Sequence, residues 1–323
     1  MSAKGCEVEL YSHNLEHVAA LQDKGAHIVG AIDFIQAVKA YPSDRMEGLF
    51  DYVFLMTKVL DNDAIARFLA PRLKADGAIC TLQNGLPEPG LSKILGPERV
   101  LGCTVGWGAT LLGPGLVKLT SSPKALCFSL GVIDPSASMH LERVKALLGL
   151  MGPVIIEPDF LGARWSKLLI NASFSGMSTV TGLTFGGVCD CMKARRCALS
   201  VIKECIDVAR ASHITIAPVQ GRDIVRLFDF GGRLKKALAL ALMPIAMAKH
   251  RGIRASMLFD LERGRRCEID AIDGAVSSQG LLCGVSTPFT DLVIKLVHGY
   301  EKGESKPCLQ SLDAFDGLLR RQR

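Results

Sequence analysis

The sequence is poor in aromatic residues, long apolar runs and clustered cysteines, and each shortage excludes a class of protein. Phe, Trp and Tyr make up 6% of the 323 residues, whereas nucleic-acid-binding surfaces often carry stacking aromatics beside their basic residues. No apolar run approaches the length of a membrane span, and the start of the chain, with Lys4, Glu7 and Glu9, is not typical of a signal peptide. The eleven cysteines are scattered, and the closest pair, in Cys189-Asp190-Cys191, is too tightly spaced for a usual zinc site. We therefore expect a cytoplasmic protein with free thiols, no metal, and neither nucleic acid nor membrane as a partner.

The remaining composition is that of a compact folded protein. Hydrophobic residues make up 49% of the chain and charged residues 22%, which is ample material for packed cores. The length favours two domains. The net charge of +6 is modest, and a small anionic substrate or cofactor accounts for it as well as any larger partner would.

The first half of the chain alternates between short apolar runs and helical patterns. Such alternation predicts a parallel α/β sheet, and we place this domain at residues 1–158. Residues 159–300 are almost entirely helical in pattern and form a second domain, and residues 301–323 form a polar tail. The predicted strands lie at 6–11, 26–30, 51–57, 78–82, 100–104, 115–119, 125–130 and 154–156, and the predicted helices at 15–24, 32–40, 63–73, 139–150, 160–180, 188–211, 217–229, 232–250 and 256–282.

Two polar residues follow neighbouring buried strands. Lys58 ends the strand at 51–57, and Asn84 follows the strand at 78–82. In an open α/β sheet, ligands bind beyond the carboxyl ends of the strands, so both residues are candidates for a binding site. The alternatives are a surface lysine and a plain Asn-Gly turn at Asn84-Gly85.

The predicted helix at 160–180 has a narrow polar stripe on an otherwise apolar surface. The stripe carries two cations and short hydrogen-bonding side chains but no acid, which suits a cleft for a small anionic, oxygen-rich ligand. An ordinary helix with a small polar face is the alternative. The stripe consists of Arg164, Lys167, Asn171, Ser175 and Ser178.

The predicted helix at 256–282 places an acid on its apolar side. Ser256 is a candidate N-terminal cap, and Glu268 falls on the apolar arc, whereas Asp270 and Asp273 are expected to point away. Burial raises the pKa of a carboxyl group, and acids of this kind often act in proton transfer. A structural ion pair with Arg266 is the alternative. A cation, a buried carboxyl and several amides together are what carbonyl reduction requires, because charge grows on oxygen as hydride reaches carbon.

Several short motifs together resemble the ketopantoate reductase (2-dehydropantoate 2-reductase) family over nearly the whole chain. Any one of them alone would carry little weight. They are Leu82-Gln-Asn-Gly-Leu86, Gly96-Pro-Glu-Arg-Val-Leu-Gly102, Gly108-Ala-Thr110, Arg164-Trp-Ser-Lys-Leu168 with Asn171, Ser256-Met-Leu258 and Glu268-Ile-Asp270.

The resemblance implies NADPH-dependent reduction of a 2-keto acid, ketopantoate, to a 2-hydroxy acid in pantothenate biosynthesis. It implies a catalytic role for Lys167, as proton donor, and for Glu268, which also lies near the cofactor. It assigns substrate binding to Asn84, Asn171, Ser175 and Ser256, although some members carry asparagine where Ser175 stands. Cofactor binding falls to Lys58, Asn84, Ala109 and Glu268, and a homodimer is one assembly left open.

The family pattern begins with a strand, a glycine-rich turn and a helix, and the sequence contains no G-x-G-x-x-G turn in that context. We expect Met1 to Gly5 to correspond to the end of that helix and the strand at 6–11 to the second strand, so the Rossmann-like sheet would lack its first strand. His13 stands near the position of an arginine that would bind the 2′-phosphate of NADPH. The alternatives are therefore a reductase of another 2-keto acid and a non-catalytic member with a defective cofactor site.

Overall fold

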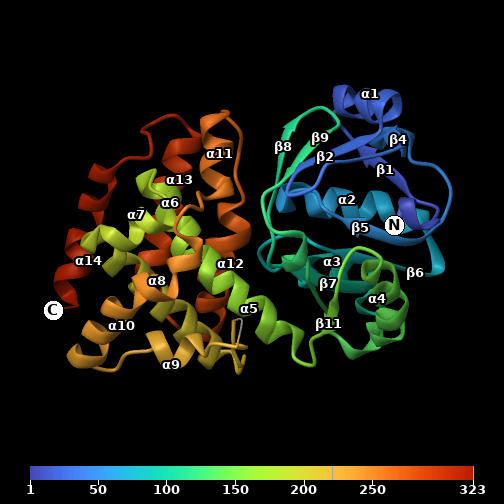
Figure 1. Ribbon diagram of the computed structural model, residues 1–323. Coiled ribbons are helices and arrows are strands. Elements are labelled where there is room, and N and C mark those ends of the chain that lie inside the picture. The colour runs from blue at the N-terminus through green and yellow to red at the C-terminus, as the bar shows by residue number, and fades with distance from the viewer. Residues whose placement is uncertain (220, 323) are drawn as a thin grey trace. The chain divides into compact units, whose positions relative to one another are not determined.

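The computed structural model describes residues 1–219 and 221–322 and divides into two compact units. The sheet unit comprises residues 1–56, 63–83 and 88–160. The helical unit comprises residues 161–323 together with two short segments, Thr57–Asn62 and Asn84–Pro87. The predicted Rossmann-like α/β part and the helical part that follows it are both confirmed (Figure 1). The boundary at 158 and the three-part division stay predictions.

The sheet unit is built on a five-stranded sheet of order β11-β10-β7-β6-β5. Strands β5, β6 and β7 are parallel neighbours, β10 runs antiparallel to β7, and β11 runs parallel to β10. Residues from Ala78 to Thr81 are completely buried, as expected of a central strand covered on both faces. The strands are β5 (Phe50–Leu55), β6 (Leu73–Thr81), β7 (Val100–Val105), β10 (Phe128–Gly131) and β11 (Val154–Ile156).

Six other strands form two smaller sheets. Parallel strands β1 and β4 make one, and the other has the order β3-β2-β9-β8. The helix predicted at 32–40 is wrong, because this segment supplies β3 and the start of β4. Its backbone groups pair with the preceding strand β2 and with the more distant β1, and such pairing overrides a weak helical pattern. The strands are β1 (Glu9–Ser12), β2 (Ala26–Gly30), β3 (Phe34–Gln36), β4 (Lys39–Pro42), β8 (Ala109–Gly113) and β9 (Leu116–Leu119).

The helices of the sheet unit form where local signals are strong. The first, α1, spans Leu15–Lys24 as predicted, because the Asn14 side chain accepts the His17 N–H at its start and Gly25 closes its end. The others are α2 (Asn62–Leu69), α3 (Glu88–Leu95) and α4 (Leu141–Gly149).

The helical unit packs around α8, whose twenty residues include twelve that are buried. Its helices are α5 (Phe160–Ile170), α6 (Gly176–Thr181), α7 (Phe185–Asp190), α8 (Met192–Ala211), α9 (Ile224–Phe228), α10 (Arg233–Ala246), α11 (Ser256–Glu262), α12 (Ile269–Cys283), α13 (Pro288–Glu301) and α14 (Asp316–Arg321). No helix in the described part of the chain is long and apolar enough to cross a membrane. The segment predicted as a polar tail sends Leu312, Phe315 and Leu319 into the core of this unit.

Two of the divided predicted helices carry candidate site residues. The segment 160–180 contains a five-residue π-helical turn, Asn171–Ser175, between α5 and α6. The segment 256–282 is interrupted after Glu262, and Gly264 in the connection has a left-handed backbone with φ of 65°. The phase of side chains beyond each interruption therefore differs from that of one continuous helix.

Candidate active site

The helical unit contains the two segments that carry Lys58 and Asn84. Thr57–Asn62 follows β5 and Asn84–Pro87 follows β6, and both belong with the helices by their contacts. Lys58 and Asn84, which follow two predicted strands, are thus packed with the segment around Glu268. Their spacing in the sequence could not reveal this contact.

Glu268 is the buried acid of this cluster. It precedes α12, its side chain is almost fully buried, and its Oε1 accepts the Val59 backbone N–H at 3.3 Å. Burial raises the pKa of Glu268, while the Val59 N–H, the charge of Lys58 and a hydrogen bond from Asn84 act against the rise. The sequence placed Glu268 within a continuous helix, but it stands at the boundary of α12. Among the described residues, no ion pair joins it to Arg266, so the alternative of that pair is not supported.

A second acid, which the sequence argument missed, holds Lys58. The Lys58 ammonium forms an ion pair with Asp260 of α11, whose side chain is only 12% exposed. Asp260 is also a like charge near Glu268 and helps to raise its pKa. The clue was available: with α11 starting at Ser256, Asp260 falls one turn further along the same face. The cluster therefore holds one cation, two carboxyl groups and an amide.

Gly85 explains why the Asn84 loop takes its shape. Its φ is 77°, and a Cβ atom at this position would overlap the backbone carbonyl of Ala271 in α12. The dipeptide Asn84-Gly85 is therefore more than a plain turn, because glycine is needed both for the left-handed backbone and for the close approach. This approach brings Asn84 within reach of Glu268.

The polar stripe of the segment 160–181 is divided by the π-helical turn. Lys167 is half-buried near the end of α5, and Asn171 is half-buried at the start of the turn. Ser175 is buried, with 8% exposure, and so is Arg164, with 1%. The five residues therefore do not share one uniform polar face, but Lys167 and Asn171 remain the accessible pair on it.

Ser256 is exposed and is the first residue of α11 rather than its cap. The cap position is Ala255, which has no side-chain oxygen to offer, so the predicted capping role is wrong. The segment is anchored by Ser178 instead, whose hydroxyl oxygen accepts the Ala255 N–H at 3.2 Å while its proton goes to the Leu183 carbonyl. Ser178 thus ties α6 to the start of α11 and leaves Ser256 accessible.

Two predicted positions lie in the sheet unit. Ala109 is the exposed first residue of β8, and His13 is exposed between β1 and α1. Their roles toward a cofactor stay predictions.

Asp273 was expected to point away from the buried side of its helix, and this prediction is wrong. The buried positions of α12 are Ile269, Ile272, Asp273, Val276 and Gly280. This series has the spacing of a helix stripe facing a core, and Asp273 lies at its centre with no exposed surface.

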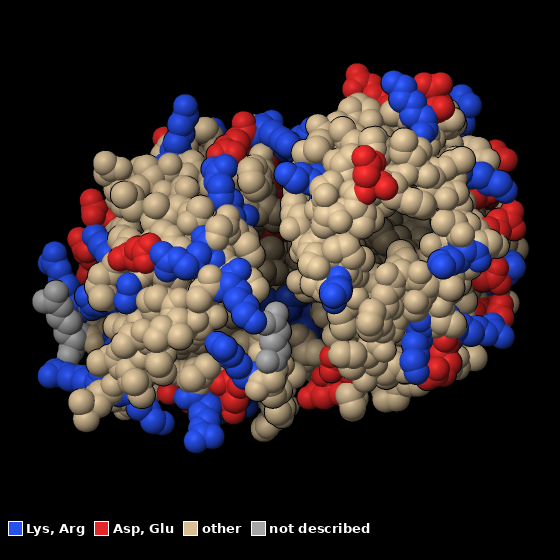
Figure 2. All heavy atoms as spheres, in the orientation of Figure 1, with Lys and Arg blue, Asp and Glu red and all other residues tan. Residues whose placement is uncertain are grey.

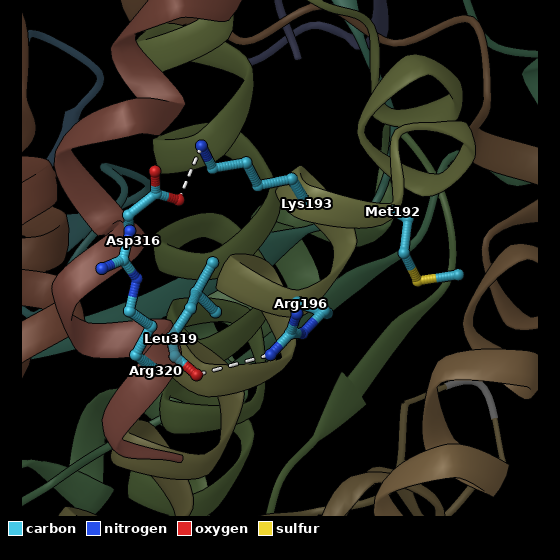
Figure 3. Close-up of a pocket in the computed structure, with 6 residues that line it drawn as sticks. All are labelled: Met192, Lys193, Arg196, Asp316, Leu319 and Arg320. Atoms are coloured by element: carbon cyan, nitrogen blue, oxygen red, sulfur yellow. Dashed lines mark hydrogen bonds and ion pairs between the residues drawn. The ribbon is translucent and has the colours of Figure 1, made fainter. Parts of the chain in front are cut away.

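A surface pocket of about 390 Å³ lies away from these residues, between α8 and α14 (Figure 3). Two of its cations already have partners within the chain. Lys193 forms ion pairs with Asp313 and Asp316, and an Arg196 N–H points to the Leu319 carbonyl at 3.5 Å. These contacts hold α14 against α8, so the pocket is explained by packing. None of the predicted site residues lines it.

Comparisons with known proteins identify a family model and several proteins that are similar to this chain. A family model described as "Ketopantoate reductase PanE/ApbA" matches residues 1–130, and its C-terminal counterpart matches residues 159–301. A 2-dehydropantoate 2-reductase of Mesorhizobium japonicum is 28% identical over 309 residues, covering 87% of this chain and 86% of the relative. The enzyme of the same name from Archaeoglobus fulgidus is 27% identical over 276 residues, covering 82% and 81%.

Solved structures show the same fold. D-mandelate dehydrogenase, solved with NADH and anilino(oxo)acetate, superposes with a TM-score of 0.78 at 22% identity, covering 94% of this chain and 93% of that one. A ketopantoate reductase from Ralstonia eutropha gives a TM-score of 0.76 at 24% identity, with the same coverage. The named relatives are oxidoreductases. With both family models matched along its length, the chain belongs to the ketopantoate reductase family.

Proposed function

We propose that the protein is an NADPH-dependent 2-dehydropantoate 2-reductase, which reduces the keto group of ketopantoate to the hydroxyl of pantoate. One observation carries the proposal beyond family membership. Lys58, Asn84 and the buried Glu268 come from three separate parts of the sequence and meet in one polar cluster of the helical unit. A buried acid is costly for stability unless it is paired and hydrogen-bonded, and clusters of buried titratable groups are common at catalytic sites.

In the proposed mechanism each residue has a distinct task. Lys167 donates a proton to the keto oxygen as negative charge develops on it. Asn171 and Ser256 hydrogen-bond the polar groups of the substrate, and Ser175 supplies a shorter hydroxyl where a longer amide would fill more space. Glu268, whose pKa is raised by burial, accepts hydrogen bonds from Val59 and Asn84 and is the acid of the site beside cofactor and substrate.

The chain's residues fit one end of the proposed cofactor. NADPH, when bound, supplies the hydride for this reduction. Asn84 and Lys58 offer an amide and a cation for the nicotinamide end, with Ala109 as a backbone contact. No described residues form the glycine-rich turn that holds a pyrophosphate at a helix N-terminus in Rossmann domains, so the mechanism assigns no residue to that task.

The test is consumption of NADPH with ketopantoate and a panel of other 2-keto acids, including aryl 2-keto acids. Ketopantoate should give the highest kcat/KM. Lys167→Ala should lower kcat by about two to four orders of magnitude, which is the scale of lost acid–base catalysis. Lys295→Ala, on the exposed side of α13, removes the same charge from the helical unit and is the matched control. Near wild-type turnover by the Lys167 variant would disprove its role, and a higher kcat/KM for another keto acid would replace the proposed substrate.

We further propose a cytoplasmic homodimer. All eleven cysteines are free thiols, as in proteins of reducing compartments. Support for the dimer comes from α10, where Leu234, Leu238 and Ile245 are 89%, 58% and 68% exposed and stand on one side of the helix. Leu238→Lys should convert a dimer to a monomer in sedimentation velocity, and a wild-type protein that sediments as a monomer at all concentrations would exclude the dimer.

A further inference from the structure

Asp273 is a fully buried acid in the helical unit. It has no exposed surface, and neither of its carboxyl oxygens has a hydrogen-bond partner among the described residues. A buried polar group without a partner costs stability, so chance alone is a poor explanation for an acid at this place. None of the tasks proposed for the reaction uses it.

The carboxyl group of Asp273 lies against Gly176. A Cβ atom built at residue 176 would stand 2.9 Å from Oδ1 of Asp273 and 3.1 Å from Val293. A larger residue at this position would therefore require the Asp273 carboxyl group and the Val293 side chain to move. The contact joins α12, which begins directly after Glu268, to the first residue of α6.

Gly176 in turn closes the π-helical turn around Asn171. Its backbone N–H is donated to the carbonyl oxygens of Asn171 and Ser173. A π-helical turn is less favourable than a continuous α-helix and is common at functional sites, where it redirects a side chain. The position of Gly176 therefore fixes the backbone from which Asn171 projects.

We infer that Asp273 is a positioning residue. Its carboxyl group packs against Gly176, and this contact holds the π-helical turn that presents Asn171 to the substrate. The inference rests on the proposed function for the role of Asn171. It deepens that function by linking the element that carries Asn171 to the element that begins at Glu268.

Burial favours the uncharged form of the Asp273 carboxyl group. Burial raises the pKa of Asp273 far above its ordinary range, and the neighbouring acid Glu204 raises it further. The other titratable group that senses Asp273 is Cys205, whose pKa is also raised by burial. No cation is described against Asp273, so a proton is what neutralises it.

The experiment compares three variants of the full chain. Asp273→Asn keeps the shape of the side chain without a charge, Asp273→Ala removes the carboxyl group, and Val276→Ala makes a cavity at an equally buried position of the same helix. Asp273→Ala should raise KM for the keto acid about tenfold while kcat changes much less, because the loss falls on a substrate hydrogen bond. Asp273→Asn should restore KM, and Val276→Ala should lower stability without raising KM.

A double-mutant cycle separates positioning from general destabilisation. In an Asn171→Ala background, Asp273→Ala should have little further effect on KM, because the group that it positions is already gone. Additive effects, or an Asp273→Asn variant as impaired as Asp273→Ala, would overturn the inference.

A second readout does not depend on turnover. Hydrogen exchange of the Gly176 amide, which is bonded within the π-helical turn, should be accelerated by Asp273→Ala more than by Val276→Ala. Equal exchange rates in the two variants would show that the contact of Asp273 with Gly176 does not hold the π-helical turn. A wild-type protein that reduces no 2-keto acid while the exchange result holds would refute the proposed function and leave the structural link between Asp273 and the turn in place.

Discussion

Replacing Glu204 by glutamine should change how the stability of the helical unit depends on pH. The free energy of unfolding of Glu204→Gln, compared with that of wild type at the same pH, should be larger at alkaline pH than at acidic pH. Glu204 lies in α8 and serves as a cap for α13, a helix distant in sequence. Its carboxyl oxygens accept the Phe289 N–H at 2.8 Å and the Thr290 N–H at 2.9 Å, and the Thr290 hydroxyl lies at 2.7 Å. Burial raises the pKa of Glu204 to about 7, although these hydrogen bonds oppose the rise.

The magnitude follows from the two pKa values. The ordinary value is 4.5 and the folded value about 7, so at 1.36 kcal/mol for each tenfold change in proton affinity the full effect is about 3 kcal/mol. The unfolded chain loses its proton first as pH rises, so stability falls between these two pKa values and levels off above the higher one. From about pH 5 to about pH 8 the expected loss from Glu204 alone is about 2.5 kcal/mol. Glutamine has no proton to lose, so Glu204→Gln should remove this contribution.

The assay is urea unfolding at both pH values, followed by the fluorescence of Trp165, which is buried in the helical unit. A Trp107→Phe background removes the tryptophan of the sheet unit, so the signal reports one unit. Glu142→Gln, at an exposed position, changes the net charge equally and is the control. If the difference between Glu204→Gln and wild type is the same at both pH values, the hydrogen bonds of α13 outweigh burial and the reasoning fails.

Three further predictions concern the candidate site. Gly85→Ala should lower activity by at least tenfold and destabilise the protein by more than about 1 kcal/mol, since φ is positive and the Ala271 carbonyl blocks a Cβ atom; kinetics and thermal unfolding check both. Ser178→Ala should cost about 1 kcal/mol and raise KM, because Ala255 loses its hydrogen-bond acceptor beside Ser256; unchanged KM would disconnect this anchor from the site. The carboxyl of Glu268, followed by NMR, should titrate above an ordinary glutamate, and a value at or below the ordinary one would contradict the burial argument.

Local signals in the sequence were sufficient for several elements. Helix α1 and strand β2 occur at the predicted residues because a cap, a terminating glycine and a short apolar run all lie within the segment itself. The helix prediction at 32–40 was wrong because the conformation of this segment depends on its pairing with β1 and β2. A weak periodicity contains no information about a partner strand, and the partner decides the outcome.

The candidate site was predictable in its members but not in its geometry. Lys58 and Asn84 were found from their places after buried strands, and Glu268 from its apolar neighbours. Asp260 was missed although it lies one turn after Ser256 in α11, and Asp273 was assigned to the exposed side although it belongs to the buried stripe of α12. The π-helical turn at Asn171 likewise has no sequence signal in its own side chains, because it depends on the close approach of Gly176 to α12.

The two interruptions of the predicted helices, at Gly264 and at Asn171–Ser175, bear on how the site is built. Both interruptions occur where an element carrying a proposed site residue meets α12: Glu268 at its start and Gly176 against Asp273. A continuous α-helix through Asn171–Ser175 would be locally more favourable than the π-helical turn, so contacts with the rest of the unit must stabilise that turn. The same helix also receives the Asn84 loop through Gly85. Three site segments therefore contact one helix, so substitutions at these contact points of α12, such as Asp273, should change substrate binding even though they touch no substrate.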